Sequence, residues 1–184
     1  MSSINYTQLA KQVRDALRAS FSELIAANPD RTFYAFAIWT DGSLQFAYPA
    51  ASTEEGLSAT AERYMKQYGK NYTVHEMRWY DGDWEFFPAG GEDHFAEINQ
   101  LLRENFSADE TIFVSKLEPL WKALLEGFQM LEKEGFFGTG KEREKITLLL
   151  AGNLEEELIQ QWATALNPLS VAQRYINWYD GNNS

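Results

Sequence analysis

The residues best suited to chemistry lie together in one short segment, residues 79–87. This segment combines aromatic rings with two carboxylates, on Trp79, Tyr80, Asp81, Asp83 and Trp84. Side chains alternate between the two faces of a strand, so one face cannot bury every ring, and some rings should be exposed. Exposed Trp and Tyr beside acidic residues are typical of protein-binding surfaces. The alternative is a hairpin buried on both faces beneath a helix over residues 93–105.

A second group of carboxylates, Glu54 and Glu55, is expected at the start of a helix. Two carboxylates that face each other across a cleft can act as general acid and general base. With Trp79 they would form a site at the strand ends, for a small ligand or for the substrate of a hydrolase. Capping and the helix dipole also favour acidic residues in a first turn, so a purely structural role stays open.

Residues 135–141 fit the pattern G-x-x-x-x-G-K of phosphate-binding loops. In such a loop a hydroxyl residue follows the lysine and binds Mg²⁺, and the loop itself follows a strand. Here Glu142 follows Lys141, and a helix is expected before the segment. We therefore expect no nucleotide and no other cofactor, and we interpret residues 135–144 as a surface loop.

The chain has two histidines, His75 and His94, and only His94 has several acidic neighbours, namely Glu92, Asp93 and Glu97. These residues lack the ligand spacing of zinc motifs, and acidic residues at a helix start are favoured by the helix dipole, so we expect no metal site. The chain contains no cysteine, which excludes disulfides and thiol catalysis. No strong catalytic motif is present, so an enzyme is the less favoured class.

The overall charge is strongly negative. The 184 residues include 27 acidic and 16 basic residues, which gives a net charge of −11. Such a surface repels phosphate groups, so we expect no nucleic acid and no membrane as partners, and we expect attraction to a basic protein. The first residues lack the pattern of a signal peptide, and the longest apolar run is far shorter than a membrane span, so we expect a cytoplasmic location.

The strand pattern predicts two hairpins and one further strand. Residues 32–39 are apolar on both alternating faces, which predicts an interior strand covered on both sides. Asp41-Gly42 predicts a tight turn into a returning strand that Pro49 ends. A second hairpin is expected over residues 72–87, turning at Asp81-Gly82. Lys145 to Ala151 read as a buried fifth strand.

Helical spacing of apolar residues predicts about six helices. The first covers residues 5–27, and the second begins at a capping box of Ser52 and Glu55. The remaining four lie around residues 95–102, after Pro119, after Asn153 and after Pro168. The chain is therefore predicted to be a single α+β domain over residues 1–184, with a mixed, largely antiparallel sheet of about five strands.

Two stretches resemble a bacterial family of domains of unknown function. The strand FYAFAIWTD at residues 33–41 and the helix start PAASTEEGL at residues 49–57 are similar to that family's FYAFALYTD-like and AANTEE-like segments. The segment RWYDGDWEF at residues 78–86 resembles its RWSPAEW-like segment. Asp81-Gly82-Asp83 stands where the family has a proline-containing turn. The resemblance implies a fold and a bacterial cytoplasmic setting, and no reaction.

Two functions follow as expectations. The first is a non-enzymatic protein-interaction module that binds a basic partner, in the manner of an immunity protein that neutralises a toxin. The second is a small-ligand-binding protein or a hydrolase with a carboxylate-containing cleft. A flat acidic and aromatic face would favour the first, whereas a concave pocket with convergent polar groups would favour the second.

Overall fold

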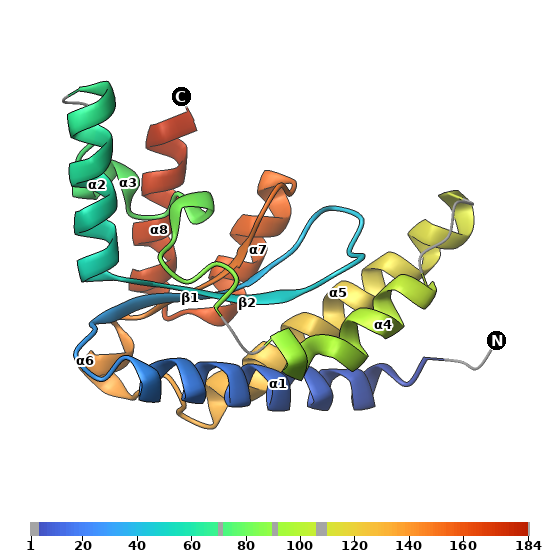
Figure 1. The fold of residues 1–184 in the computed structure, drawn as a ribbon. Coiled ribbons are helices and arrows are strands. Elements are labelled where there is room, and N and C mark those ends of the chain that lie inside the picture. Colours follow the sequence, from blue (N-terminus) through green and yellow to red (C-terminus); the bar gives the residue numbers. More distant parts are fainter. Residues whose placement is uncertain (1–3, 70–71, 90–91, 106–109, 184) are drawn as a thin grey trace.

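The structure is a computed structural model that describes residues 4–69, 72–89, 92–105 and 110–183. In this part of the chain, eight α-helices and two 3₁₀ helices surround one mixed sheet (Figure 1). The three strands are β1 (Phe33–Trp39), β2 (Tyr48–Thr53) and β3 (Thr147–Ala151). The predicted α+β class is confirmed. The predicted counts of about five strands and six helices are wrong.

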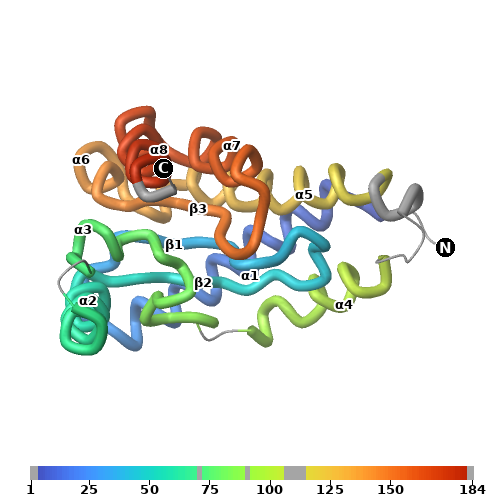
Figure 2. The backbone as a smooth tube through the Cα atoms, turned by 90° about the horizontal axis from the view of Figure 1, so that it is seen from above, coloured from blue at the N-terminus to red at the C-terminus, as the bar shows by residue number. Residues whose placement is uncertain are grey.

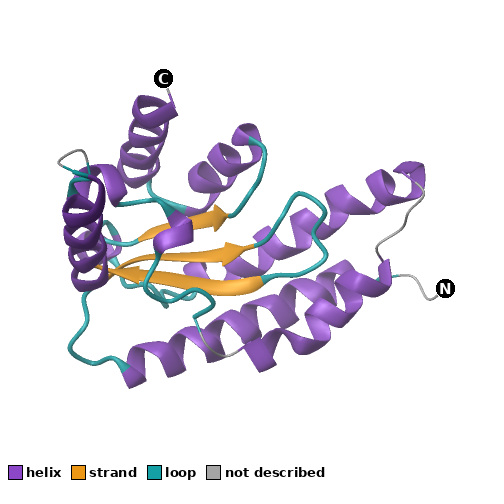
Figure 3. Ribbon diagram, turned by 45° about the horizontal axis from the view of Figure 1, so that its top comes forward, coloured by secondary structure: helices purple, strands orange, loops and turns teal. Residues whose placement is uncertain are grey.

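β1 is the central strand, as its two apolar faces predicted. The strand order is β2-β1-β3, with β2 antiparallel and β3 parallel to β1 (Figure 3). The pairing of β1 with β2 shifts register between Phe33 and Ala35. At this irregularity the consecutive residues Tyr34 and Ala35 both pack into the core on the same side of the sheet. Because β1 and β3 are parallel, their carboxyl ends, Trp39 and Ala151, lie at the same edge.

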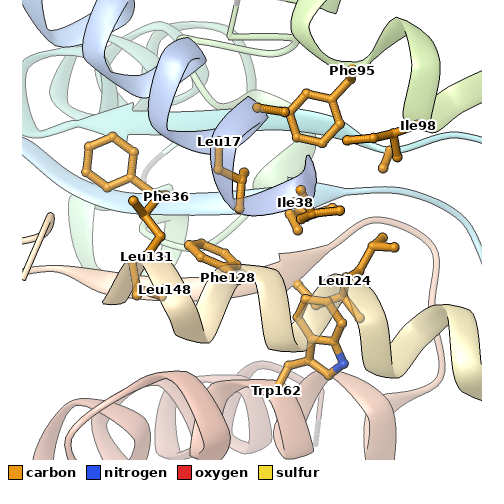
Figure 4. Packing of buried hydrophobic residues seen from close by; sticks show 14 of the residues in the cluster. Leu17, Phe36, Ile38, Phe95, Ile98, Leu124, Phe128, Leu131, Leu148 and Trp162 are labelled. Atoms are coloured by element: carbon orange, nitrogen blue, oxygen red, sulfur yellow. The ribbon is translucent and has the colours of Figure 1, made fainter. Parts of the chain in front are cut away.

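One face of the sheet packs on three helices (Figure 1). They are α1 (Tyr6–Ala27), α4 (Ala96–Asn105) and α5 (Glu110–Lys133). Figure 4 shows Phe36 and Ile38 of β1 among Leu17 and Phe128 in this core. α1 and α5 approach closely at Gly127, where a side chain would not fit: a Cβ there would lie only 2.5 Å from the carbonyl oxygen of Ala10. The helix predicted over residues 5–27 is confirmed.

Helices also cover the opposite face of the sheet (Figure 2), and a second core lies between them and the strands. Its helices are α2 (Glu54–Tyr68), α3 (Val74–Met77), α7 (Glu156–Leu166) and α8 (Leu169–Asn183). The small residues Ala35 and Ala37 of β1 leave room on this face for Trp79, Trp84 and Trp178. α7 contributes to both cores, so it closes the side of the sheet next to β3. No described helix combines the length and the apolar character that crossing a membrane requires.

The predicted tight hairpin at Asp41-Gly42 is wrong. The ladder between β1 and β2 closes with Trp39 opposite Tyr48, so residues 40–47 form a wide connection. Leu44 has a φ of 49° and a buried side chain, which takes the backbone out of the extended strand conformation. Asn99 of α4 replaces a partner strand: Ala47 N–H donates to its Oδ1 at 2.7 Å, and its Nδ2 donates to Ala47 O at 3.1 Å.

Pro49 does not end β2 but lies within it, opposite Ile38. β2 is an edge strand of this sheet, and an edge strand tolerates the missing N–H of proline. The outer side of β2 is partly covered by residues 86–89. Ala51 N–H donates to Phe86 O at 3.0 Å, Phe86 N–H donates to Ala51 O at 3.2 Å, and Ala89 N–H donates to Pro49 O at 2.8 Å.

The predicted second hairpin over residues 72–87 is also wrong. Thr73 and Glu76 form a capping box that starts the short helix α3, so His75 lies in a helix and not in a strand. A 3₁₀ helix, η1 (Asp81–Asp83), follows where a β-turn was expected. The one isolated bridge that Phe86 forms in the described residues is with Ala51 of β2, and not with the predicted partner strand at residues 72–79. The spacing T-x-x-E was the missed helix signal.

Several helix starts differ from the prediction by one or more residues. Thr53, and not Ser52, caps α2, since its side chain accepts the Gly56 N–H at 3.1 Å. Pro119 lies inside α5 and not near its start. Glu155, and not Asn153, occupies the cap position of α7. The helix after Pro168 begins as predicted.

Residues 135–144 are not a loose surface loop. Phe137 is buried in the first core, and the short helix α6 (Gly140–Arg143) ends in a buried arginine. Arg143 Nε donates to both carboxylate oxygens of Glu132, at 2.8 and 2.9 Å, and Nη1 donates to Ile146 O at 2.5 Å. The glycines therefore let the chain turn from α5 into β3. This turn accounts for their spacing, and no phosphate-binding loop is needed to explain it.

Candidate functional site

A cavity of about 230 Å³ opens at the carboxyl ends of β1 and β3. Four segments meet there: the end of β3 with the loop that follows it, the segment before and into η1, the helix α7 through Ile159, and the helix α8. Ligands of open sheets with parallel strands bind at this edge, because the connections diverge where the strands end. Trp79, Tyr80 and Asp81 line the cavity, so three of the predicted binding residues lie together.

Gly152 shapes the wall of the cavity directly after β3. Its φ is +119°, and a Cβ at this position would lie 1.9 Å from the carbonyl oxygen of Thr40. Any side chain would therefore displace the backbone at the end of β1. The Gly152 N–H donates to Oδ2 of Asp81 at 2.5 Å, which joins η1 to the end of β3.

Asp81 is a half-buried carboxylate without a cationic neighbour in the described part of the chain. Its removal from water raises its pKa, although the backbone N–H groups of Gly152 and Gly82 favour the ionised form. No lysine, arginine or histidine occurs among the described residues that line the cavity. A carboxylate in this state lacks the cation that usually offsets the loss of hydration.

Five of the 13 residues that line the cavity are aromatic. Trp79 contacts Trp178 with ring centroids 5.5 Å apart at 73°, and Tyr80 contacts Trp178 at 5.5 Å and 86°. Tyr175 and Tyr179 extend the wall along α8. Burial, and then the charge of Asp81, raise the pKa of Tyr175, so its phenol stays protonated at neutral pH. Trp178 is fixed by its Nε1–H, which donates to His75 O at 2.8 Å.

The structure places Trp84 and Asp83 outside the cavity. Trp84 is 6% exposed and belongs to the second core, so the expectation that it anchors an exposed interface is corrected. Asp83 accepts hydrogen bonds from the Tyr64 hydroxyl, at 2.8 and 2.9 Å to its two oxygens. Of the three predicted aromatic binding residues, Trp79 is 6% exposed and Tyr80 is 47% exposed. Tyr80 therefore presents the accessible ring.

Glu54 and Glu55 do not face each other across a cleft. Glu54 forms a bidentate ion pair with Arg78, with both oxygen to nitrogen distances at 2.8 Å. The Arg78 guanidinium also lies over the ring of Tyr34, 4.6 Å from its centroid. Glu55 accepts from the N–H and the hydroxyl of Thr32, both at 2.9 Å. Both carboxylates thus hold the start of α2 to its neighbours, and neither lines the cavity.

A second hollow, of about 440 Å³, lies between α1 and the segment formed by η2 (Glu92–Phe95) and α4. Its rim carries the carboxylates of Asp15, Asp93 and Glu97, of which Asp15 is paired with the neighbouring Arg14 at 2.6 Å. No lysine or arginine occurs among the described residues that line the hollow itself. His94 Nε2 lies 2.9 Å from a carboxylate oxygen of Glu23 of α1. No group of three or more His, Asp or Glu suited to a metal occurs in the described residues.

Ten of the 13 residues that line the cavity were not predicted from the sequence. Tyr175, Trp178 and Tyr179 of the last helix, and Gly152 after β3, were not recognised as site residues. For Gly152 a signal exists, because a glycine directly after a buried strand marks the strand edge where ligands bind. For the residues of α8 only the packing of that helix against β3 reveals the site.

Comparison with known proteins identifies the family. A family model described as a domain of unknown function, DUF4303, matches residues 13–168. The chain belongs to the DUF4303 family. This match confirms the resemblance to a family of domains of unknown function. No curated protein and no solved structure matches the chain. The matched region of this DUF4303 protein contains all three strands and residues 79–81, and it ends before α8.

Proposed function

We propose that this DUF4303 protein is a non-enzymatic interaction module that binds a basic partner protein, in the manner of an immunity protein. The observation that supports the proposal is the acidic hollow between α1 and η2–α4. Its carboxylates on Asp93 and Glu97 are exposed, and the described lining offers them no lysine or arginine. The net charge of −11 extends this negative field over the molecule.

The charge acts mainly on encounter and specificity. Exposed ion pairs contribute only about 0.2–1 kcal/mol each, so single pairs with the partner cannot provide tight binding. A field of one sign instead raises the association rate and disfavours acidic competitors. We therefore expect a partner whose lysine or arginine side chains enter the hollow over the small residues Ala16 and Ala19.

The test uses the products of the neighbouring genes as candidate partners, because an immunity protein is encoded beside its toxin. Association rates are measured at increasing salt for the wild type and for Asp93→Asn combined with Glu97→Gln. The substitutions should slow association by about 3–10-fold and flatten its salt dependence. The matched control, Glu155→Gln with Glu157→Gln, removes two exposed charges at the start of the α7 segment, and should change the rate less than about twofold.

Two outcomes contradict the proposal. In the first, no basic product of a neighbouring gene binds the protein at low salt. In the second, a partner binds, but the two double variants slow its association equally, which assigns the effect to net charge and not to the hollow. Melting curves of both variants must match that of the wild type within about 1 °C, since substitutions of exposed residues rarely change stability by more than ~0.5 kcal/mol.

A second candidate function is binding of a small ligand, and the cavity at the ends of β1 and β3 favours it. The cavity is concave, has aromatic walls and contains the desolvated carboxylate of Asp81. A hydrolase of the paired-carboxylate type needs a second carboxylate facing the first. Asp81 is the only carboxylate among the described lining residues, so the geometry supports binding better than hydrolysis.

A further inference from the structure

We propose that the cavity at the carboxyl ends of β1 and β3 binds an organic ammonium group, which Asp81 pairs with and which the rings of Trp79, Tyr80 and Trp178 surround. The proposal concerns a site separate from the acidic hollow, so it does not depend on the partner suggested above. The ammonium group can belong to a lysine side chain of a protein or to a free small amine. The chemistry of recognition is the same in both cases.

The carboxylate provides the first argument. Asp81 is directed at the end of β3, where its Oδ2 accepts the Gly152 N–H at 2.5 Å. The described chain supplies backbone N–H groups to this carboxylate but no cation. The carboxylate of Asp81 has already lost part of its hydration in the folded protein. A cation that enters the cavity would therefore pair with it at a lower desolvation cost than with a carboxylate on an exposed surface.

The aromatic rings provide the second argument. Ring faces carry partial negative charge, and cages of Trp and Tyr are the usual receptors for alkylammonium groups. Here two rings from residues 79–80 meet the rings of Trp178, Tyr175 and Tyr179, with Trp79 and Tyr80 both at steep angles to Trp178. An anion would be repelled by both the carboxylate and the ring faces. A neutral apolar ligand would leave Asp81 without compensation.

Size and access provide the third argument. A cavity of about 230 Å³ is smaller than the ~300–1,000 Å³ typical of sites for drug-sized ligands. It suits the terminal group of a side chain or a small amine, and it is too small for a nucleotide or a large cofactor. Tyr80 is 47% exposed, so the cavity has an accessible aromatic rim.

The experiment measures binding of defined probes by tryptophan fluorescence and by NMR. The cationic probes are choline and n-butylammonium, and 3,3-dimethylbutan-1-ol serves as the neutral isostere of choline. We expect saturable binding of the cations, with the neutral isostere at least about tenfold weaker. A peptide containing one lysine is compared with its glutamine counterpart. Tighter binding of the lysine peptide than of n-butylammonium identifies a protein side chain as the source, and the reverse order identifies a free amine.

Matched variants separate Asp81 from the general negative charge. Asp81→Asn should weaken binding of the cationic probes by at least about tenfold, because the ion pair is lost. Asp83→Asn removes the same charge two residues away, where the carboxylate accepts from Tyr64, and should change affinity less than about twofold. Asp93→Asn with Glu97→Gln, in the acidic hollow, should also leave probe affinity unchanged, so that failure of one proposal is distinguishable from failure of the other.

A second variant covers the case in which Asp81→Asn does not fold. Tyr80→Ala removes an accessible ring of the cavity rim and should weaken the cationic probes by about 3–10-fold without loss of the fold. The proposal is overturned if neither cation binds saturably, if the neutral isostere binds as well as choline, or if both Asp81→Asn and Tyr80→Ala, folded, bind like the wild type.

Discussion

At the scale of single residues, Asp81 and Gly152 line the cavity in arrangements that do not favour the stability of the fold. Gly152 occupies a backbone conformation that favours glycine and approaches the carbonyl of Thr40 too closely for a side chain. Asp81 then accepts the N–H of Gly152 with a carboxylate that burial makes costly to ionise. A group that costs stability and lines a cavity is typical of a functional site.

The pKa of Asp81 leads to a prediction about stability and pH. Because the folded-state pKa is raised, stability is highest below the unfolded-state pKa and falls as pH increases through the folded-state value. Asp81→Asn keeps an oxygen that can accept the Gly152 N–H but removes the charge. We therefore expect the variant to melt at or above the wild-type temperature at pH 7, and the difference to vanish below about pH 3.9, the ordinary value for aspartate.

Thermal melts of both proteins between pH 3 and pH 8, followed by circular dichroism, provide the measurement. The other titratable side chains that line the cavity around Asp81 are the tyrosines Tyr80, Tyr175 and Tyr179. Burial raises the pKa of Tyr175, so its phenol does not titrate in this pH range. A variant that melts well below the wild type at pH 7 would show that the ionised carboxylate has a structural role, in contradiction to this prediction.

At the scale of elements, the connection from α5 to β3 depends on Arg143. This buried side chain pairs with Glu132, and its Nη2 also donates to Leu166 O of α7 at 2.8 Å. Asn167, at the end of α7, binds both backbone groups of Leu148, with its Oδ1 at 2.8 Å from the N–H nitrogen and its Nδ2 at 2.7 Å from the carbonyl oxygen. Polar side chains thus satisfy the outer edge of β3, where a further strand would otherwise pair.

Replacement of Arg143 tests this structural role. Arg143→Ala should lower the free energy of unfolding by about 3–5 kcal/mol, because Glu132 and the carbonyls of Ile146 and Leu166 lose their buried partner. The matched control is Lys141→Ala, which removes the exposed lysine of the phosphate-loop-like pattern and should change stability by less than ~0.5 kcal/mol. Urea denaturation measures both. Equal effects of the two substitutions would contradict the assigned role of Arg143.

At the scale of the whole molecule, the excess of 11 negative charges sets the response to salt. Repulsion between these charges destabilises the compact state, and salt screens it over about 10 Å at 0.1 M. Salt also weakens the exposed ion pairs, such as Lys66 with Glu62 at 2.7 Å, but such pairs contribute little. We therefore expect the melting temperature to rise by a few degrees between about 0.01 and 0.2 M NaCl.

Differential scanning calorimetry at neutral pH measures this effect, with KCl as a control, because screening depends on ionic strength and not on the identity of the monovalent cation. Glu155→Gln combined with Glu157→Gln should reduce the rise, since it removes two of the excess negative charges without touching a described ion pair. A melting temperature that falls with salt would show that the ion pairs outweigh the repulsion.

The fold was predictable where local pattern and tertiary packing agree. β1 was recognisable because its residues are apolar on both faces, and α1 because its apolar residues recur at helical spacing. Residues 43–47 were not, because a tertiary contact decides their conformation, and residues 72–87 were not, because a local helix-capping signal competes there with a strand-like composition. Asn99, which is distant in sequence, satisfies Ala47 in place of a strand, and the capping of Thr73 by Glu76 outweighs the β-propensity of the aromatic residues nearby.

The sequence by itself determined the charge, the central strand, the main helices and the family, because these depend on composition and on short-range periodicity. It also singled out Trp79, Tyr80 and Asp81, because aromatic and acidic residues coincide there. Only the tertiary structure decided that Trp84 is buried and that Asp81 faces rings of α8. The reason is physical: residues 79–81 and the last helix are about a hundred positions apart, and they meet only because β3 pairs in parallel with β1 and brings its carboxyl end, with the helices that follow, beside η1.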